Sequence, residues 1–352
     1  MGHGSFRDKL RAGAFREPAT LGYSEMAMSL PVDDIGRVVG SRLGDRFAGD
    51  YLVEGPVADS ANGRVFRLTA GTDRIRLAAK ICTGPADARR QFAALTAAAA
   101  VLNRTSGSGT RVPAPVALVE EHGLLVMEWI DGRSFAGLLR SPWQPPALAL
   151  DGAARAGTWL AGYHAVSPGT AAPFDYAQGL AMLEALLAPL EGDPPAFTVG
   201  RHWLAQLERM AERNGSVSLP IRLHHGDFKP GNVLLTADAV YGIDIHSEYQ
   251  SSVAEDLAYF IVDMELACFH PRGLRLLRHR EALTRRVVDG YGVERWPGLA
   301  ALVGWLRLHK IARNWVTFHT GRLRGVQRRY AAVCLRWMAR RSPIDCPAHG
   351  SR

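Results

Sequence analysis

Residues 223–244 constrain what this chain can fold into and do more than any other part of the sequence. They read LHHGDFKPGNVLLTADAVYGID. Glycine and proline interrupt this stretch at Gly226 and Pro230, and both residue types are unfavourable inside a helix. The polar residues Asp227 and Asn232 are therefore predicted to lie on a loop.

The apolar runs after this loop predict a β-hairpin made of residues 233–235 and 240–243. The hairpin would bring Asp244, which follows its second strand, to the same side as the loop. One carboxylate could then accept a proton, while an amide oxygen and a second carboxylate could hold a hard cation such as Mg²⁺. This combination predicts phosphoryl transfer.

The length and composition fit a globular protein with two domains. The chain has 352 residues, of which 47% are hydrophobic and 22% charged. No run of eighteen apolar residues occurs, and residues 1–16 carry charges where a signal peptide needs an apolar core. We therefore expect a cytoplasmic protein. Its four cysteines are not closely spaced, which favours reduced thiols over disulfides or a zinc site.

Positive charge is concentrated in the last quarter of the chain. Residues 266–352 hold seventeen Arg and one Lys against four acids, about +14, whereas the whole chain has a formal charge of +8. This pattern fits a solvated, arginine-rich helical surface, or a pocket or patch for an anionic partner. Lysine is scarce in comparison, with Lys9, Lys80, Lys229 and Lys310 beside thirty-eight Arg.

The N-terminal third is predicted to be rich in strands. Residues 1–30 show no sustained periodicity, and residues 31–43 have the pattern of a short amphipathic helix. A helix is expected at 87–102, and 58–63 is expected to be a small-residue turn able to approach a phosphate. Strands are predicted at residues 50–57, 64–69, 74–82, 112–119 and 123–129.

The chain after residue 133 is predicted to be mainly helical. Proline and glycine separate or end its apolar periodic segments. Helices are predicted at residues 135–139, 151–166, 178–190, 202–213, 254–268, 273–291, 298–317 and 327–341.

Three motifs, together with the strand lysine Lys80, resemble the aminoglycoside phosphotransferase and choline kinase group. They are HGDFKPGN at residues 225–232, Ile-Asp at 243–244 and EDLA at 255–258. This group is the small-molecule branch of the protein-kinase-like fold, and the resemblance covers roughly residues 51–317.

The resemblance implies roles for the residues of the central loop. Asp227 is similar to the catalytic base that accepts the proton of the substrate hydroxyl, and Lys229 to the lysine that steadies the transferring phosphate. Asn232 and Asp244 are similar to the ligands of Mg²⁺. Asp256 corresponds to an acid that ties down the catalytic loop.

The resemblance also implies an ATP site in the first part of the chain. Lys80 corresponds to the lysine that pairs with the α- and β-phosphates, and Ser60 and Gly63 belong to the nucleotide loop. Glu128 and Ile130 lie in the segment whose backbone would hold adenine. The sequence departs from the protein-kinase pattern at Gln91, where a glutamate would be expected to pair with the lysine.

The implied fold is α+β and bilobal, with a small antiparallel-sheet N-lobe that carries one helix and a larger, mainly helical C-lobe. The expected domain organisation is an N-terminal arm with a short helix, a nucleotide-binding N-lobe, a hinge, a helical C-lobe with the catalytic loop and acceptor site, and a C-terminal tail. These parts span residues 1–46, 47–128, 129–132, 133–341 and 342–352.

The implied function is transfer of the γ-phosphate of ATP, with Mg²⁺, to a hydroxyl of a small molecule. Eleven residues lie between Asp244 and Asp256, which leaves no room for the segment on which protein kinases dock a peptide. We expect helices after Asp256, including residues 309–315, to form the acceptor pocket. Their positive charge favours a neutral or anionic sugar or metabolite over an aminoglycoside, unless acids such as Asp263 and Glu265 line the pocket.

The alternative is a nucleotide-binding pseudokinase or regulatory protein whose basic C-terminal face binds an anionic partner. A nucleic-acid partner is not expected, and the sequence does not determine the oligomeric state.

Overall fold

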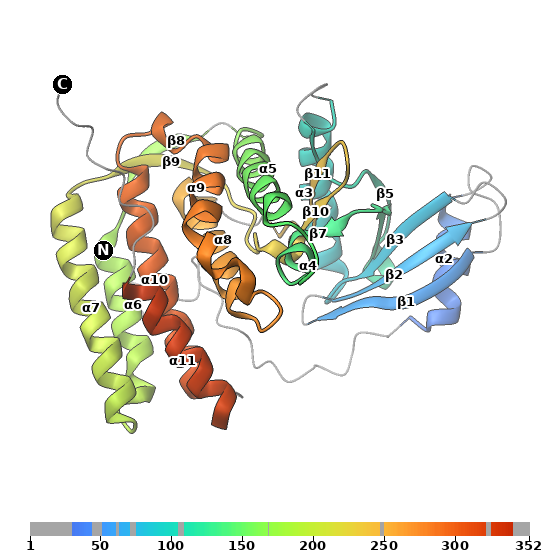
Figure 1. Cartoon of the computed structure of the whole chain (residues 1–352). Helices are drawn as coiled ribbons and strands as arrows, with labels where there is room; N and C mark the ends of the chain where they lie inside the picture. The colour runs from blue at the N-terminus through green and yellow to red at the C-terminus, as the bar shows by residue number, and fades with distance from the viewer. Residues whose placement is uncertain are drawn as a thin grey trace, which may run out of the picture. The chain divides into compact units, whose positions relative to one another are not determined.

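The structure is a computed structural model in which residues 30–43, 51–60, 63–70, 75–104, 109–167, 169–246, 250–321 and 325–340 are described (Figure 1). The chain divides into two compact units. We call them the small unit (Met1–Arg89 and Ala117–Val126) and the large unit (Arg90–Val116 and Met127–Arg352). Residues 1–29 of the predicted arm and the predicted tail at 342–352 lie outside the described residues, and the predicted domain limits stay a prediction.

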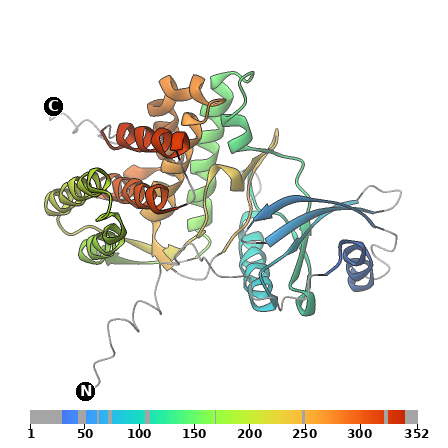
Figure 2. The ribbon, with the colours of Figure 1, turned by 90° about the horizontal axis from the view of Figure 1, so that it is seen from below.

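The main sheet has five strands in the order β1-β2-β3-β6-β5. Its strands are β1 (Tyr51–Ser60), β2 (Gly63–Ala70), β3 (Ile75–Ile81), β5 (Pro115–Val119) and β6 (Leu124–Glu128). The first three pair antiparallel, as predicted. Helix α2 (Val32–Leu43) lies beside β1, where a Cβ on Gly36 would be 3.1 Å from the carbonyl oxygen of Tyr51 (Figure 2).

The turn predicted at residues 58–63 is wrong in extent. Ala58 pairs with Val65 and Ser60 with Gly63, so β1 continues almost to the start of β2. The small residues of this segment favour a loop, but pairing with β2 keeps them extended. Cross-strand neighbours influence whether a residue lies in a strand as much as its intrinsic β propensity does. Only residues 61 and 62 separate the two strands.

The large unit contains two further sheets. One has the order β4-β11-β10-β7, with β10 and β11 antiparallel, so the predicted hairpin is confirmed. The other has the order β12-β9-β8, which the sequence did not predict. Their strands are β4 (Thr110–Arg111), β7 (Arg133–Ser134), β8 (Thr170–Pro173), β9 (Ser218–Leu223), β10 (Val233–Leu235), β11 (Val240–Gly242) and β12 (Gln250–Ser252).

Helices make up most of the remaining structure, close to their predicted positions. The α-helices are α3 (Pro85–Leu102), α4 (Phe135–Leu139), α5 (Pro146–His164), α6 (Tyr176–Leu187), α7 (Pro194–Asn214), α8 (Val253–Phe269), α9 (Arg280–Tyr291), α10 (Leu299–Thr320) and α11 (Gly325–Arg340). Short 3-10 helices occur at Glu120–His122, Ala188–Leu190, Pro230–Asn232, Leu274–His279 and Val293–Arg295.

The core of the large unit is built on three buried tryptophans, Trp159, Trp305 and Trp315. Each indole N–H donates to a backbone carbonyl, of Arg111, Leu207 and Ala196 respectively. Helix α10 carries two of them and packs against α6, α7 and α8 (Figure 2). The indoles therefore fill the core without leaving their N–H groups unsatisfied.

Among the described residues, no helix is both long and apolar enough to cross a membrane. The three cysteines of the described part, Cys82, Cys268 and Cys334, are buried free thiols, as predicted. Cys346 lies outside the described residues, and the cytoplasmic location stays a prediction.

Candidate active site

The loop between β9 and β10 carries the predicted catalytic residues. The backbone reverses at Gly226, whose φ is 86°, a conformation that residues with a side chain rarely adopt. A short 3-10 helix, Pro230–Asn232, then leads into β10. This sharp path keeps Asp227, Lys229 and Asn232 close together on one short loop.

The carboxylate of Asp227 is the centre of this loop. Lys229 Nζ lies 2.6 Å from Asp227 Oδ2, and Asn232 Nδ2 donates to the same oxygen at 3.1 Å. Asn232 Nδ2 also donates to the Asp227 carbonyl at 2.9 Å. The Asp227 side chain keeps 29% of its exposure, so the carboxylate is both held in place and open to a substrate.

Asp244 lies two residues after β11. The Ile243 N–H donates to the Asn232 carbonyl at 2.9 Å, which fixes the residue before Asp244 beside the loop. Asp244 has a φ of 63°, and no other non-glycine among the described residues has a positive φ. Such a conformation costs on the order of 1–3 kcal/mol and is characteristic of functional sites. His246 Nε2 lies 3.1 Å from Asp244 Oδ1.

The donor set fits Mg²⁺. Asn232 binds Asp227 through its amide nitrogen, so its amide oxygen is the atom suited to a cation. Asp244 supplies a carboxylate from the neighbouring strand end. No group of three or more His, Cys, Asp or Glu side chains able to hold a metal occurs within the described ranges. The amide oxygen of Asn232 and the carboxylate of Asp244 suit Mg²⁺, which binds one or two protein oxygens and completes its shell with water and phosphate.

The buried ring of His225 is affected by the carboxylates of the site. Burial lowers its pKa to about 4, although the charges of Asp256, Asp227 and Asp244 all act to raise it. The Asp227 N–H donates to His225 Nδ1 at 3.3 Å, so the neutral ring carries its proton on Nε2. The charges of three carboxylates thus act on one neutral, buried histidine.

Helix α5 packs against the β10–β11 hairpin. Gly152 lies against Leu235, where a Cβ would be 2.9 Å from a side-chain methyl carbon. One turn on, both Nη atoms of Arg155 donate to the Thr236 carbonyl at 3.1 Å. The hairpin is therefore fastened along one face of the helix.

Trp159, a further turn along α5, is the contact that the sequence did not reveal. A Cβ on Gly242 would lie 2.0 Å from its indole ring, so β11 approaches this helix only because residue 242 is glycine. The indole also stacks on Phe228 at 5.3 Å and meets His225 edge-on at 5.7 Å. The spacing of Gly152, Arg155 and Trp159 by three or four residues is the signal that could have identified this face.

Helices α8 and α10 present polar side chains at the catalytic loop. Glu255, Tyr259 and Asp263 are four residues apart and share one face of α8. Arg313 Nη1 donates to the Tyr259 hydroxyl at 3.1 Å, and Lys310 Nζ lies 4.6 Å from the centroid of the Tyr259 ring. We call these five residues the α8–α10 polar face.

The charges of the catalytic loop act on this polar face. Burial raises the pKa of Asp263; Lys310 opposes the rise, Asp227 adds to it and Lys229 opposes it. Asp263 is therefore near both the lysine of α10 and the two predicted catalytic residues.

Part of the predicted acceptor segment, residues 309–315, is core instead. His309 and Trp315 are buried, whereas Lys310 and Arg313 contact Tyr259 and belong to the polar face. The suggestion that Glu265 could line the acceptor pocket is also wrong. Glu265 is fully buried and bonded to Arg280 and Arg307. The distribution of charge along the sequence shows neither that His309 and Trp315 are buried nor that Glu265 is paired with buried arginines.

The predicted nucleotide residues are divided between the two units. Lys80, on β3, is buried in the small unit and opposite Val65. A Cβ on Gly63 would lie 2.2 Å from the Ile81 carbonyl oxygen, so close strand pairing alone accounts for this glycine. Glu128 and Ile130 belong to the large unit. Glu128 Oε2 accepts from the Ala114 N–H at 3.1 Å. Nucleotide binding by these residues, including Ser60, stays a prediction.

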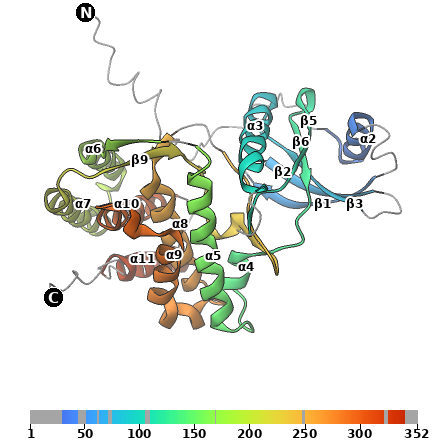
Figure 3. The same ribbon diagram turned by 90° about the horizontal axis from the view of Figure 1, so that it is seen from above.

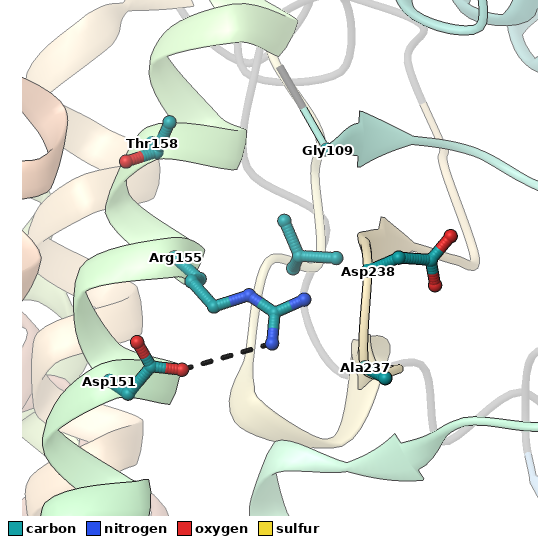
Figure 4. A pocket seen from close by; sticks show the side chains of 7 residues that line it. Gly109, Asp151, Arg155, Thr158, Ala237 and Asp238 are labelled. Atoms are coloured by element: carbon teal, nitrogen blue, oxygen red, sulfur yellow. Dashed lines mark ion pairs between the residues drawn. The ribbon is translucent and has the colours of Figure 1, made fainter. Parts of the chain in front are cut away.

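A hollow of about 330 Å³ lies at the turn of the hairpin, where it is lined by residues of α5 and by Ala237 and Asp238. Figure 4 shows Arg155 in its middle, between Asp151 on α5 and Asp238 on the hairpin turn. Arg155 Nη1 is 3.8 Å from Asp151 Oδ2. The guanidinium is thus already committed to the Thr236 carbonyl and to an acid.

Comparisons with solved structures give the same fold at low sequence identity. The amicoumacin kinase in complex with AMP-PNP and Ca²⁺ is 14% identical, with a TM-score of 0.52, covering 88% of this chain and 95% of that chain. Choline kinase from Cryptosporidium parvum Iowa II is 11% identical, with a TM-score of 0.51, covering 85% and 90%. Spectinomycin phosphotransferase is 14% identical, with a TM-score of 0.50, covering 84% and 90%. These likenesses confirm the predicted kinase-like α+β fold.

No curated protein matches the chain in sequence. The model of the phosphotransferase enzyme family, in contrast, matches residues 55–302, which is more than half of the chain and includes the catalytic loop, Asp244 and helix α8. The resemblance stated from the motifs is therefore confirmed. The chain belongs to the phosphotransferase enzyme family, and it is an enzyme that transfers a phosphoryl group to a small molecule.

Proposed function

We propose that the enzyme transfers the γ-phosphate of ATP to a hydroxyl group of a neutral or anionic, polyhydroxylated small molecule, with Mg²⁺ as cofactor. One observation carries this proposal. The Asp227 carboxylate is partly exposed, fixed through Oδ2 by Lys229 and Asn232, and bordered by the α8–α10 polar face.

Asp227 is the group that would accept the proton of the acceptor hydroxyl. Its Oδ2 atom holds Lys229 and Asn232, so Oδ1 is the oxygen to which the hydroxyl would donate. A carboxylate fixed in this way orients the attacking oxygen as well as taking its proton, and positioning accounts for much of the catalysis in phosphoryl transfer.

Lys229 and the metal ligands would handle the phosphate charge. Lys229 keeps 43% of its side-chain exposure, so its ammonium group can reach a phosphate oxygen beside Asp227. Asn232 and Asp244 would hold Mg²⁺, which neutralises the charge of the phosphates when it is bound. The amicoumacin kinase structure, with AMP-PNP and Ca²⁺, supports the use of a nucleotide and a divalent cation here.

The charges on the polar face support a neutral or anionic acceptor. The acids near Asp227 have cationic neighbours from the protein itself. Asp227 contacts Lys229, Asp263 lies near Lys310, and Arg313 binds Tyr259 on the same face as the acids. A polycation such as an aminoglycoside binds best to carboxylates that lack such partners. Hydroxyl groups, in contrast, can donate to the acids and accept from the bases.

The test is a phosphotransfer assay with ATP and Mg²⁺ on three acceptor sets: neutral sugars and polyols, sugar acids, and aminoglycosides. We expect turnover in the first two sets. Asp227→Asn should lower kcat by about 10³-fold or more, because the base is lost while shape is kept. The matched control Asp151→Asn, an exposed acid of the large unit, should keep wild-type activity. Faster transfer to aminoglycosides than to the other sets would refute the proposed acceptor class.

The alternative, a non-catalytic protein with a basic docking face, has less support. Several arginines that give residues 266–352 their charge have internal partners. Arg280 and Arg307 bind the buried Glu265, and Arg275 Nε donates to the Ser141 carbonyl at 2.8 Å. Family membership also favours an enzyme.

A further inference from the structure

A chain of buried hydrogen bonds runs from the end of α9 to the backbone of the catalytic loop. The Tyr291 hydroxyl lies 2.8 Å from His164 Nδ1, and His164 Nε2 lies 3.2 Å from Asp256 Oδ2. The same Oδ2 atom accepts from the His225 N–H at 2.8 Å. All four residues are buried, and His225 is two residues before the proposed base Asp227.

The direction of each hydrogen bond in this chain follows from the chemistry of its ends. The ionised Asp256 carboxylate can only accept, so His164 Nε2 carries the proton. His164 Nδ1 must then accept from the Tyr291 hydroxyl. Burial lowers the pKa of His164 despite the nearby carboxylate, which keeps the ring neutral. Burial alone would raise the pKa of Asp256, but His224 and His164 outweigh it, and the pKa lies below its ordinary value.

A second set of contacts fixes the backbone of His164. Arg222, one residue before the end of β9, donates from Nη1 to the His164 carbonyl at 2.6 Å. Its guanidinium lies 5.9 Å from the ring centroid of Trp296, which in turn lies 5.9 Å from that of Tyr291. His164 is therefore held at both its ring and its backbone by residues that also border the catalytic loop or α9.

The position of Tyr291 is set by the close packing of α5 and α9, which lie side by side (Figure 3). A Cβ on Gly157 would lie 2.1 Å from the Val287 carbonyl oxygen, and one on Gly290 would lie 2.2 Å from that of Ala154. Thr158 Oγ1 also donates to the Gly290 carbonyl at 3.3 Å. Such backbone contact leaves little freedom for the residue that follows Gly290.

We propose that Tyr291 and His164 are positioning residues, which set the catalytic loop through Asp256 without touching the substrate. This inference rests on the proposed function of Asp227. Losing the Tyr291 hydroxyl leaves a buried His164 Nδ1 without its donor, and the ring can then rotate away from Asp256. A small displacement of the loop is enough to slow transfer strongly, since the attacking hydroxyl must lie in line with the phosphate.

Two measurements on the full chain test whether Tyr291 positions the catalytic loop. In Tyr291→Phe we expect kcat to fall about tenfold or more, with the KM values for ATP and acceptor within about twofold. Amide hydrogen exchange in residues 223–232 should become faster, because the His225 N–H loses a fixed acceptor. The control is Tyr330→Phe on α11, which removes a hydroxyl that donates to the Phe269 carbonyl at the end of α8 and should change neither readout.

Substitution of His164 separates positioning from packing. His164→Gln keeps an N–H donor for Asp256 and should retain more activity than His164→Leu, which fills the space without a donor. Equal activity of these two variants would overturn the proposal, as would unchanged exchange in residues 223–232 of Tyr291→Phe. Hydrogen exchange is measured without substrate. It therefore tests the positioning role of Tyr291 and His164 separately from the phosphotransfer proposed for Asp227.

Discussion

His309 shows how the fold fixes the protonation state of a single residue. Its ring stacks on Trp305 at 5.1 Å, and Nε2 lies 3.2 Å from the Gly179 carbonyl, so the Nε2–H tautomer is selected. Burial lowers the pKa of His309 to about 3; Arg313 adds to this shift, the bond to Gly179 opposes it, and Lys310 adds to it. The folded protein therefore excludes the imidazolium form at this position.

This neutral histidine predicts a pH dependence of stability. An unfolded histidine titrates near pH 6.5, so between about pH 6.5 and pH 3 the unfolded chain binds a proton that the folded chain does not. The free energy of unfolding then decreases as the pH falls, by about 1.4 kcal/mol per pH unit. His309→Gln keeps a donor for Gly179, and from pH 7.5 to 5.0 it should lose about 2 kcal/mol less than wild type in urea unfolding.

The control for this measurement is His202→Gln, which changes an exposed histidine on α7 and should keep the wild-type pH slope. If His309→Gln also kept that slope, the buried ring would not be neutral, and the assigned tautomer would be wrong.

At the residue scale, the sequence predicts the chemistry of the loop but not its support. Asp227, Lys229 and Asn232 lie within six residues, so their proximity follows from the loop itself, and the structure brings all three together. Trp159 belongs to a helix more than sixty residues away. Its fit to Gly242 depends on how α5 docks on the hairpin, which no local pattern contains.

At the element scale, the α5–α9 contact is sensitive to a single methyl group. Gly290→Ala would place a Cβ 2.2 Å from the Ala154 carbonyl oxygen, with two further backbone atoms at 3.0 and 3.2 Å. Alanine favours a helix by about 1 kcal/mol over glycine, but overpacking against backbone costs about 1–3 kcal/mol. We expect a net loss of stability in urea or thermal unfolding.

The matched control for this substitution is Gly304→Ala on α10. Its nearest contact would be Met210 Cε at 3.9 Å, so the gain in helix propensity should remain and leave the protein unchanged or up to about 1 kcal/mol more stable. Similar unfolding midpoints for the two variants would mean that α5 and α9 do not meet through their glycines.

The boundaries of the elements show which signals mislead. Helix α7 was expected to begin at residue 202 but begins at Pro194, because prolines suit the first turn, where their missing N–H is not needed. The Asp193 carboxylate accepts from the Ala196 N–H at 3.3 Å as its N-cap. Strands β8 and β12 were missed because they have only four and three residues. Strand β9 was missed because it contains Pro220 and pairs with segments far apart in the chain.

At the scale of the whole molecule, the large unit contains a buried ionic cluster that joins four helical segments. Glu265 on α8 accepts from Arg280 Nη1 at 2.6 Å and from Arg307 Nη2 at 2.6 Å. Arg307 Nη2 also donates to the Met338 carbonyl on α11 at 3.0 Å, and Arg280 lies 4.6 Å from the ring centroid of Trp337. Some of the positive charge that the sequence places after residue 266 is therefore internal.

Glu265→Gln removes the carboxylate between two buried guanidinium groups, whose charges cannot return to water in the folded state. Breaking a buried pair in this way costs about 3–5 kcal/mol, so the urea midpoint should fall sharply. The control Glu184→Gln breaks an exposed pair with Arg201 and should cost less than about 1 kcal/mol. A comparable loss of unfolding free energy in the two variants would show that Arg280 and Arg307 are accessible to water and that their charges are not buried.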